Sequence, residues 1–222
     1  MKMKSVKIKI CGLKTLADIE IVNRYQPDYI GFVFAHTRRF VTDEQAFDMS
    51  RVLDSRIQAV GVFVNEPLEH VAALCDRGVI NVVQLHGEES EAYVRELKRR
   101  TDATVIKAVR VQSAEQVFRQ MSQAADYMLY DTYRKGEPGG TGERFSLGIL
   151  QESLRRMKEN GQTVKPYFLA GGLDCGNVGS VLEQMECFAV DVSTGVETDG
   201  VKDEAKIRQF IEHVRQLSGC EL

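Results

Sequence analysis

Two side chains that could exchange protons stand at the ends of short apolar runs. Cys11 ends the run Lys7–Cys11, and Asp131 ends the run Tyr127–Asp131. A thiol acts as a general base when positive charge or a dipole lowers its pKa, and a carboxyl acts as a general acid when burial raises its pKa. Lys9 is near Cys11, and strand alternation would give it the same facing, deeper in the protein. A lone Cys or Asp is more often structural, so the residue types alone make both only candidates.

Two later apolar runs are followed by glycine and small hydroxyl residues. These segments are Leu169–Leu173, with Gly171 and Gly172, and Val192–Val196, with Ser193, Thr194 and Gly195. Such residues let backbone N–H groups approach an anion closely, and helix N-termini add a favourable dipole. We predict that both segments bind a phosphate group; the alternative is that their glycines only form tight turns.

A third glycine-rich segment follows the run that ends at Asp131. It reads Gly136-Glu-Pro-Gly-Gly-Thr-Gly142 and lies in a stretch, 133–145, that is long enough to close over a bound ligand. An ordinary surface loop explains the composition equally well, so the sequence leaves the choice between a lid and a surface loop open.

The elements that would position these residues form a repeating pattern. Eight apolar, β-branched-rich runs are separated by amphipathic segments of helical length; the runs are Lys7–Cys11, Tyr29–Phe34, Ala59–Val64, Val82–His86, Val105–Val109, Tyr127–Asp131, Tyr167–Ala170 and Ala189–Val192. Apolar strands alternating with helices are typical of a parallel sheet covered on its outer face. We predict an α/β fold, a single-domain (β/α)8 TIM barrel spanning residues 1–222. A doubly wound sheet is the competing architecture, but Cys11-Gly12-Leu13-Lys14 is not its glycine fingerprint.

Helix starts support this count. Thr15–Asp18, Thr42–Gln45 and Ser113–Gln116 resemble capping boxes. Asn65 is expected to cap the helix whose first turn contains Pro67. The final segment, 203–217, has apolar residues at helical spacing.

In a barrel, the residues that follow the strands meet at one end. Polar, charged or glycine residues follow almost every run; they are Cys11, Ala35–Arg39, Asn65, His86–Glu88, Arg110, Asp131–Thr132, Gly171–Gly172 and Asp191–Gly195. Each could simply end a strand, but together they predict a ring of functional groups. Cys11 and Asp131 would then face each other across the barrel mouth.

Composition excludes several classes of function. A net charge of −3 and a pI near 5.9 give no electrostatic basis for binding nucleic acid or a membrane. The basic start leads into too few apolar residues for a signal peptide, and no run could span a bilayer. The five cysteines (Cys11, Cys75, Cys175, Cys187 and Cys220) show neither a CxxC pair nor metal-ligand spacing. We therefore expect free thiols, no metal, no cofactor and a reducing cytoplasm.

Several motifs in order over nearly the whole chain resemble the phosphoribosylanthranilate isomerase family. They are Lys9–Leu13, Gly31–Ala35 with Arg39, Val83–Gly87, Asp131, Gly139–Gly142 with Phe145, Leu169–Leu173 and Asp191–Glu197. The resemblance implies a metal-free Amadori rearrangement of N-(5′-phosphoribosyl)anthranilate, a small phosphorylated substrate, with no cofactor. It leaves open whether the chain is a monomer or a homodimer.

The resemblance also implies roles for individual residues. The family's acid matches Asp131, which would protonate the ribose ring oxygen, and its base matches Cys11, which would remove the C2 proton. Arg39 would hold the anthranilate carboxylate through its guanidinium group. The remaining positions implied to bind substrate are His86, Gly142, Gly171, Gly172, Asp191, Ser193, Thr194 and Gly195.

Three departures from the family pattern are small. Ser146 stands where aspartate is frequent, Thr194 stands where serine is common, and the loop 36–39 lacks the family's usual residues before arginine. The carboxylate role could fall on Arg38 or on Arg39. We choose Arg39 because Phe40-Val41 matches the aromatic-aliphatic pair that follows the family arginine.

Two other functions compete with this interpretation. Another phosphate-binding barrel could act on a related aminoaldose phosphate or as an epimerase. The histidine-pathway isomerases use two aspartates, which Cys11 argues against, and metal-dependent epimerases need a histidine cluster, whereas only His86 of four histidines is well placed. A barrel that binds a phosphorylated metabolite without turning it over is the third possibility.

Overall fold

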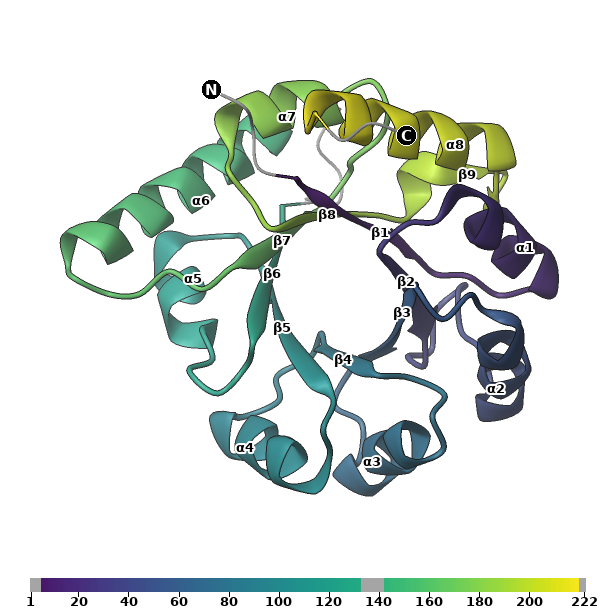
Figure 1. Cartoon of the computed structure of the whole chain (residues 1–222). Helices are drawn as coiled ribbons and strands as arrows, with labels where there is room; N and C mark the ends of the chain where they lie inside the picture. Colours follow the sequence, from purple (N-terminus) through teal and green to yellow (C-terminus); the bar gives the residue numbers. More distant parts are fainter. Residues whose placement is uncertain (1–4, 133–141, 220–222) are drawn as a thin grey trace.

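Eight parallel strands close into a barrel in chain order, and helices surround it (Figure 1). The computed structural model describes residues 5–132 and 142–219, with the side chains of 142–146 left aside. The barrel strands are β1 (Lys7–Cys11), β2 (Tyr29–Val33), β3 (Gln58–Phe63), β4 (Val82–Leu85), β5 (Thr104–Arg110), β6 (Tyr127–Asp131), β7 (Tyr167–Ala170) and β8 (Ala189–Val192). The predicted TIM barrel is therefore confirmed, with strand ends that differ from the prediction by one residue at most.

Each strand is followed by a helix that packs against the outside of the barrel. The helices are α1 (Leu16–Tyr25), α2 (Asp43–Val52), α3 (Leu68–Asp76), α4 (Glu91–Arg100), α5 (Ala114–Gln120), α6 (Gly142–Glu159), α7 (Val178–Gln184) and α8 (Glu204–Leu217). Between β8 and α8 lie a short 3₁₀ helix, η1 (Thr194–Val196), and a two-stranded hairpin of β9 (Glu197–Thr198) and β10 (Val201–Lys202).

Strand alternation divides the apolar residues into two separate cores. The inner core fills the barrel with residues such as Val60, Ile106 and Phe168. The outer core lies between strands and helices, and includes Ile8 and Ile10 of β1. Since Ile8 and Ile10 face outward, Lys9 and Cys11 must face into the barrel.

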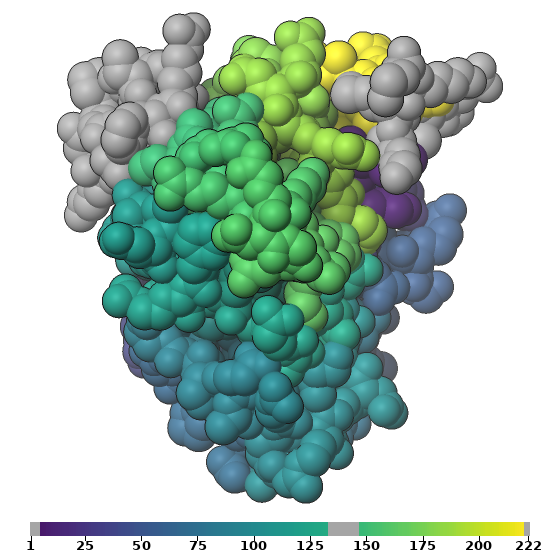
Figure 2. All heavy atoms as spheres, turned by 90° about the vertical axis from the view of Figure 1, so that its left-hand side faces the viewer, coloured from purple at the N-terminus to yellow at the C-terminus, as the bar shows by residue number. Residues whose placement is uncertain are grey.

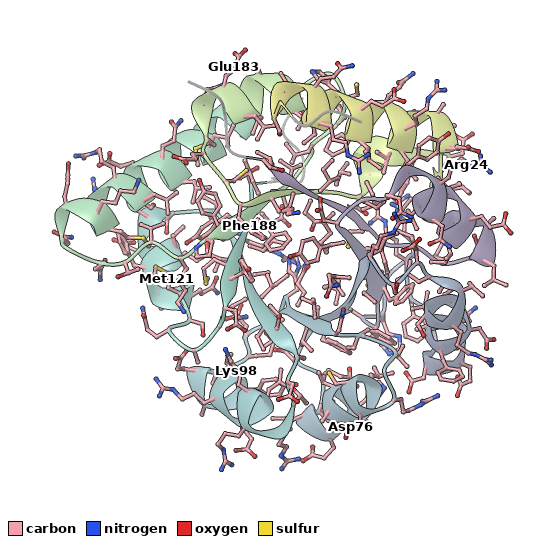
Figure 3. All side chains as sticks on the ribbon, viewed as in Figure 1. Arg24, Asp76, Lys98, Met121, Glu183 and Phe188 are labelled. Atoms are coloured by element: carbon pink, nitrogen blue, oxygen red, sulfur yellow. The ribbon has the colours of Figure 1, made fainter. Side chains whose placement is uncertain are left out.

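The helices form a layer around the barrel. Seen from the side, α6 lies above α5 and α4 on one face of the molecule (Figure 2). Charged side chains such as Arg24 and Glu183 lie at the outer rim, whereas Phe188 lies beside the central strands (Figure 3). Within the described part of the chain, no helix is both long and apolar enough to cross a membrane.

The structure confirms two of the four predicted caps in full and a third, at Ser113, in part, because only one of its two capping-box hydrogen bonds is present. Thr15 and Thr42 form complete capping boxes with Asp18 and Gln45, and the Ser113 hydroxyl accepts the backbone N–H of Gln116.

The predicted cap at Asn65 is wrong, because Pro67 occupies the cap position of α3 and makes no side-chain cap bond. Asn65 instead has a left-handed backbone (φ 54°), and its Oδ1 accepts the N–H of Glu88, 2.8 Å away. It therefore ties the loop after β3 to the loop after β4.

Candidate active site

Cys11 lies at the carboxyl end of β1, with its side chain directed into the barrel mouth. Its neighbour across the β1–β2 pair is Gly31, where an added Cβ would come within 2.8 Å of the Cys11 sulfur. The glycine therefore provides the space that the thiol occupies. The Ser193 hydroxyl donates to the carbonyl oxygen of Cys11 at 3.0 Å, which joins β1 to the segment after β8.

Beneath Cys11, one layer deeper, Lys9 forms an ion pair inside the barrel. Its Nζ lies 3.0 and 2.9 Å from the two carboxylate oxygens of Asp191, and the Lys9 side chain is 0% exposed. The two residues are direct partners in the β1–β8 register. Burial alone would lower the pKa of Lys9, but the charge of Asp191, together with that of Cys11, raises it, so Lys9 stays protonated.

The Cys11 thiol is subject to opposing influences. Burial raises its pKa above the ordinary value, because a thiolate is poorly solvated there. The positive charges of Lys9 and Lys202 lower the pKa, and the negative charge of Asp191 raises it further. In the free protein the two lysines therefore do not outweigh burial, and the pKa of Cys11 is raised rather than lowered.

Asp131 ends β6 and is 24% exposed at the mouth. Its Oδ2 lies 3.7 Å from Nε2 of His86, the residue that follows β4. Going round the barrel, β6 is separated from β1 by β7 and β8 on one side and by four strands on the other. Asp131 and Cys11 thus end strands that are not neighbours in the barrel, and that their side chains face each other across the mouth stays a prediction.

Gln84 orients the ring of His86. Its side-chain amide nitrogen lies 3.0 Å from Nδ1 of His86, and Nε2 of the same ring is directed toward Asp131. Gln84 is 1% exposed, and its Oε1 is buried with no hydrogen-bond partner among the described residues. The sequence analysis missed Gln84, although it is part of the Val83–Gly87 motif.

Arg38 and Arg39 both reach the carboxylate of Glu197. Arg39 does so through Nε at 2.7 Å and Nη2 at 3.1 Å, and Nη2 also lies 2.8 Å from the Thr194 hydroxyl. Arg38 makes one contact, of 2.7 Å, from a side chain that is 54% exposed. Lys202, also missed in the sequence, donates to the same carboxylate at 2.9 Å.

This cluster of four charged groups is held together by Glu197. Burial would raise the pKa of Glu197, but the hydrogen bonds from Arg39 and Lys202 lower it to about 2. Glu197 therefore stays ionised and fixes the Arg39 guanidinium between the loop after β2 and the segment after β8. No signal in the sequence pointed to Lys202, since a lone lysine in a hairpin is usually solvated.

The two predicted phosphate-binding segments lie side by side after β7 and β8. Gly171 and Gly172 have positive φ values, 102° and 69°, which residues with a side chain rarely adopt. Gly195 is packed against the other segment, because an added Cβ there would lie 2.0 Å from the Leu173 carbonyl oxygen. Backbone conformation therefore accounts for Gly171 and Gly172, and close packing accounts for Gly195, whether or not a phosphate binds there.

Replacing Gly195 by alanine is expected to destabilise the protein by about 1–3 kcal/mol, because the two segments must move apart. It should also raise KM for a phosphorylated substrate more than it lowers kcat. Urea unfolding and steady-state kinetics would measure both effects. Gly148→Ala is the matched control, because an added Cβ there meets nothing within 4 Å; an equal loss of stability in both variants would contradict the packing argument.

One predicted site residue cannot be placed with the others. Gly142 is the first residue of α6, and the preceding residues of its motif, like most of the stretch 133–145 that could be a lid or a surface loop, lie outside the described residues. Among the described residues, no group of three or more His, Cys, Asp or Glu side chains is arranged to hold a metal ion.

Comparison with known proteins gives one consistent result. A model of the N-(5′-phosphoribosyl)anthranilate (PRA) isomerase family matches residues 8–213. The N-(5′-phosphoribosyl)anthranilate isomerase of Lachnoclostridium phytofermentans is 48% identical over 209 residues, which cover 93% of this chain and 96% of that protein.

Two solved structures show the same fold. The crystal structure of phosphoribosyl anthranilate isomerase from Thermotoga maritima superposes with a TM-score of 0.81 at 34% identity, over 95% of this chain and 99% of the other. A structure of phosphoribosyl anthranilate isomerase in complex with reduced 1-(o-carboxyphenylamino)-1-deoxyribulose 5-phosphate has a TM-score of 0.78 at 32% identity, with the same coverage.

Proposed function

The chain belongs to the N-(5′-phosphoribosyl)anthranilate isomerase family, and from this premise we propose that it performs that isomerisation in tryptophan biosynthesis. The reaction is the Amadori rearrangement of N-(5′-phosphoribosyl)anthranilate to 1-(o-carboxyphenylamino)-1-deoxyribulose 5-phosphate. The observation that carries the proposal is the family match over residues 8–213. An aldose becomes a ketose without net oxidation, so an acid and a base suffice.

We propose that Asp131 is the acid. Its carboxyl group would protonate the ribose ring oxygen, the C1–O bond would break, and the anthranilate nitrogen would supply the electron pair that forms the Schiff base. The position of Asp131 at the mouth, at the carboxyl end of β6 and beside His86, supports this role. His86 would contact the substrate next to the acid.

Cys11 would then act as the base on the open-chain intermediate. Its thiolate would remove the proton from C2, and the electron pair would move into the C1–C2 bond as the iminium nitrogen is neutralised. The resulting enolamine tautomerises to the ketone, and the protons gained and lost balance over the reaction. The side chain of Cys11 faces the interior of the mouth, where a sugar carbon could reach it.

Arg39 would bind the anthranilate carboxylate. Glu197 engages its Nε and Nη2, so the Nη1 edge is the one that can approach the substrate. The backbone of Gly171, Gly172, Ser193, Thr194 and Gly195 would bind the phosphate. Asp191 was predicted to bind substrate, but its carboxylate is engaged by Lys9, so we propose an indirect role for it.

Fluorescence of the anthranilate group tests the proposed function. Incubating the purified protein with phosphoribosylanthranilate should quench the fluorescence far faster than background hydrolysis alters it. The aminoaldose phosphate of the histidine pathway, offered in parallel, should not be converted. No turnover of phosphoribosylanthranilate, or turnover of the other substrate instead, would overturn the proposal.

Arg39→Lys is expected to raise KM about tenfold or more while kcat changes less, because lysine cannot form the paired contacts of a guanidinium group. Arg38→Lys is the matched variant, since Arg38 reaches the same carboxylate from a more exposed position. We expect less than a threefold change in KM for it. A larger effect at Arg38 would transfer the carboxylate-binding role to that residue.

We also propose a cytoplasmic location, which fits a biosynthetic enzyme whose described cysteines, Cys11, Cys75, Cys175 and Cys187, are all free thiols. That residues 1–222 form one domain, and that the chain is a monomer or a homodimer without nucleic-acid or membrane partners, stay predictions. Size-exclusion chromatography with light scattering decides between the two oligomeric states.

A further inference from the structure

We propose that Lys9 is the positioning residue that enables Cys11 to act as a base. Its ammonium group, fixed inside the barrel by Asp191, provides the positive charge against which a Cys11 thiolate forms. The inference rests on the proposed role of Cys11 in catalysis. In it, Asp191 holds Lys9 in place, and Lys9 stabilises the Cys11 thiolate.

The position of Lys9 is unusual for a lysine. Its side chain is 0% exposed and lies inside the barrel, whose inner core is built mainly of apolar residues such as Ile106 and Phe168. A buried ion pair seldom stabilises a fold more than apolar residues of the same size would. A gain in stability therefore does not by itself account for the pair in this layer.

Asp191 determines where the charge of Lys9 is placed. Both of its oxygens accept from Nζ, at 3.0 and 2.9 Å, and the backbones of the two residues are direct partners in the β1–β8 register. The side chain of Cys11 is two residues along the same strand and on the same face as Lys9. The positive charge of Lys9 therefore acts on the Cys11 thiol and lowers its pKa.

The charged groups that face Cys11 come from three elements. They are Lys9 on β1, Asp191 on β8 and Lys202 on β10, whereas β2 presents only Gly31. Lys202 is bound to Glu197 at 2.9 Å and to the Ser193 carbonyl at 3.0 Å. Its charge lowers the pKa of Cys11 less than the charge of Lys9 does. Lys9 lowers the pKa of Cys11 more than any other group, against the larger opposing effect of burial.

Alkylation of Cys11 by iodoacetamide, followed against pH by mass spectrometry of its peptide, measures thiolate formation without substrate. The test uses the full chain as wild type, Lys9→Met, Lys9→Gln and Lys9→Arg. We expect the alkylation midpoint to rise by about one pH unit or more in the Met and Gln variants, which corresponds to about tenfold less thiolate. In Lys9→Arg the alkylation midpoint should lie closer to the wild-type value, since arginine keeps the positive charge.

Lys107→Met is the matched control. Lys107 is also buried and ion-paired, with Glu89 at 2.9 Å, but on the outward side of β5. Lys107→Met shows the general effect of removing a buried, ion-paired lysine. In this variant the Cys11 alkylation midpoint should stay at the wild-type value. Lys9→Gln can still hydrogen-bond to Asp191, which keeps the test informative if Lys9→Met does not fold.

Kinetics complete the test. The Lys9 variants should lose kcat about tenfold or more with KM changed less than threefold, and the limb of the kcat profile that reports Cys11 should move to higher pH together with the alkylation midpoint. An unchanged alkylation midpoint in Lys9→Met or Lys9→Gln would overturn the inference, whatever happens to kcat. Failure of the proposed function is distinguishable, because the wild-type protein would then not convert phosphoribosylanthranilate, whereas normal turnover in Cys11→Ser would remove only Cys11 from the role of base.

Discussion

Replacing Cys11 by serine is expected to lower kcat about a thousandfold while the protein stays folded. Serine has nearly the same shape, so it fits the space next to Gly31, but its hydroxyl does not ionise in the range where a thiol does. Losing a positioned general base costs typically a hundredfold to ten-thousandfold in rate. Steady-state kinetics by anthranilate fluorescence, alongside a thermal melt, would measure both the loss and the intact fold.

Cys75→Ser is the control for a general effect of losing a thiol. Cys75 lies on α3, outside the barrel, and is partly buried. Its replacement should leave kcat within about twofold of wild type, because surface and helix substitutions seldom reach the site. If Cys11→Ser kept more than a tenth of wild-type kcat, Cys11 would not be the base.

Replacing Asp131 by asparagine is expected to lower kcat by about a thousandfold to ten-thousandfold. The amide keeps the size of the side chain and its place at the end of β6, but it cannot deliver a proton to the ring oxygen. Because the substrate contacts provided by other elements remain, KM should change by much less. Single-turnover kinetics with bound substrate would show that the loss is in the chemical step.

Asp126→Asn is the control for the effect of the same substitution on folding, because Asp126 lies at the opposite end of β6, away from the mouth. Asp126 precedes β6, pairs with Lys98, and accepts the N–H of Val105 at 2.9 Å. Its replacement should lower the thermal midpoint without lowering kcat at 25 °C. Near-normal turnover in Asp131→Asn would remove Asp131 from the role of acid.

Much of the fold could be predicted because its signals are local. Apolar runs of four to six residues, helix-length amphipathic segments and threonine caps each depend on residues close in sequence. The cap predicted at Asn65 was wrong for a tertiary reason. The Asn65 side chain accepts from Glu88 on the next loop, and this contact takes the oxygen that would otherwise cap α3.

The mouth was predictable as a ring of residues but not as a network. Strand order places Cys11, His86 and Asp131 at one end of the barrel, since all three end or directly follow parallel strands. Which groups touch depends on the register of neighbouring strands and on loop paths. Gln84 and Lys202 were missed for another reason: their partners His86 and Glu197 are only two and five residues away, but a lone glutamine or lysine carries no functional signal in the sequence.

By itself, the sequence determined that this protein is a parallel barrel whose mouth carries Cys11 and Asp131, and that Lys9 shares the facing of Cys11. These properties follow from periodicity, which is local. Only the tertiary structure decided that Lys9 pairs with Asp191, 182 residues away, and that Arg39 pairs with Glu197, 158 residues away. The physical reason is that charges act through space, so a residue's chemistry is determined by neighbours that only the closed barrel brings within a few ångströms.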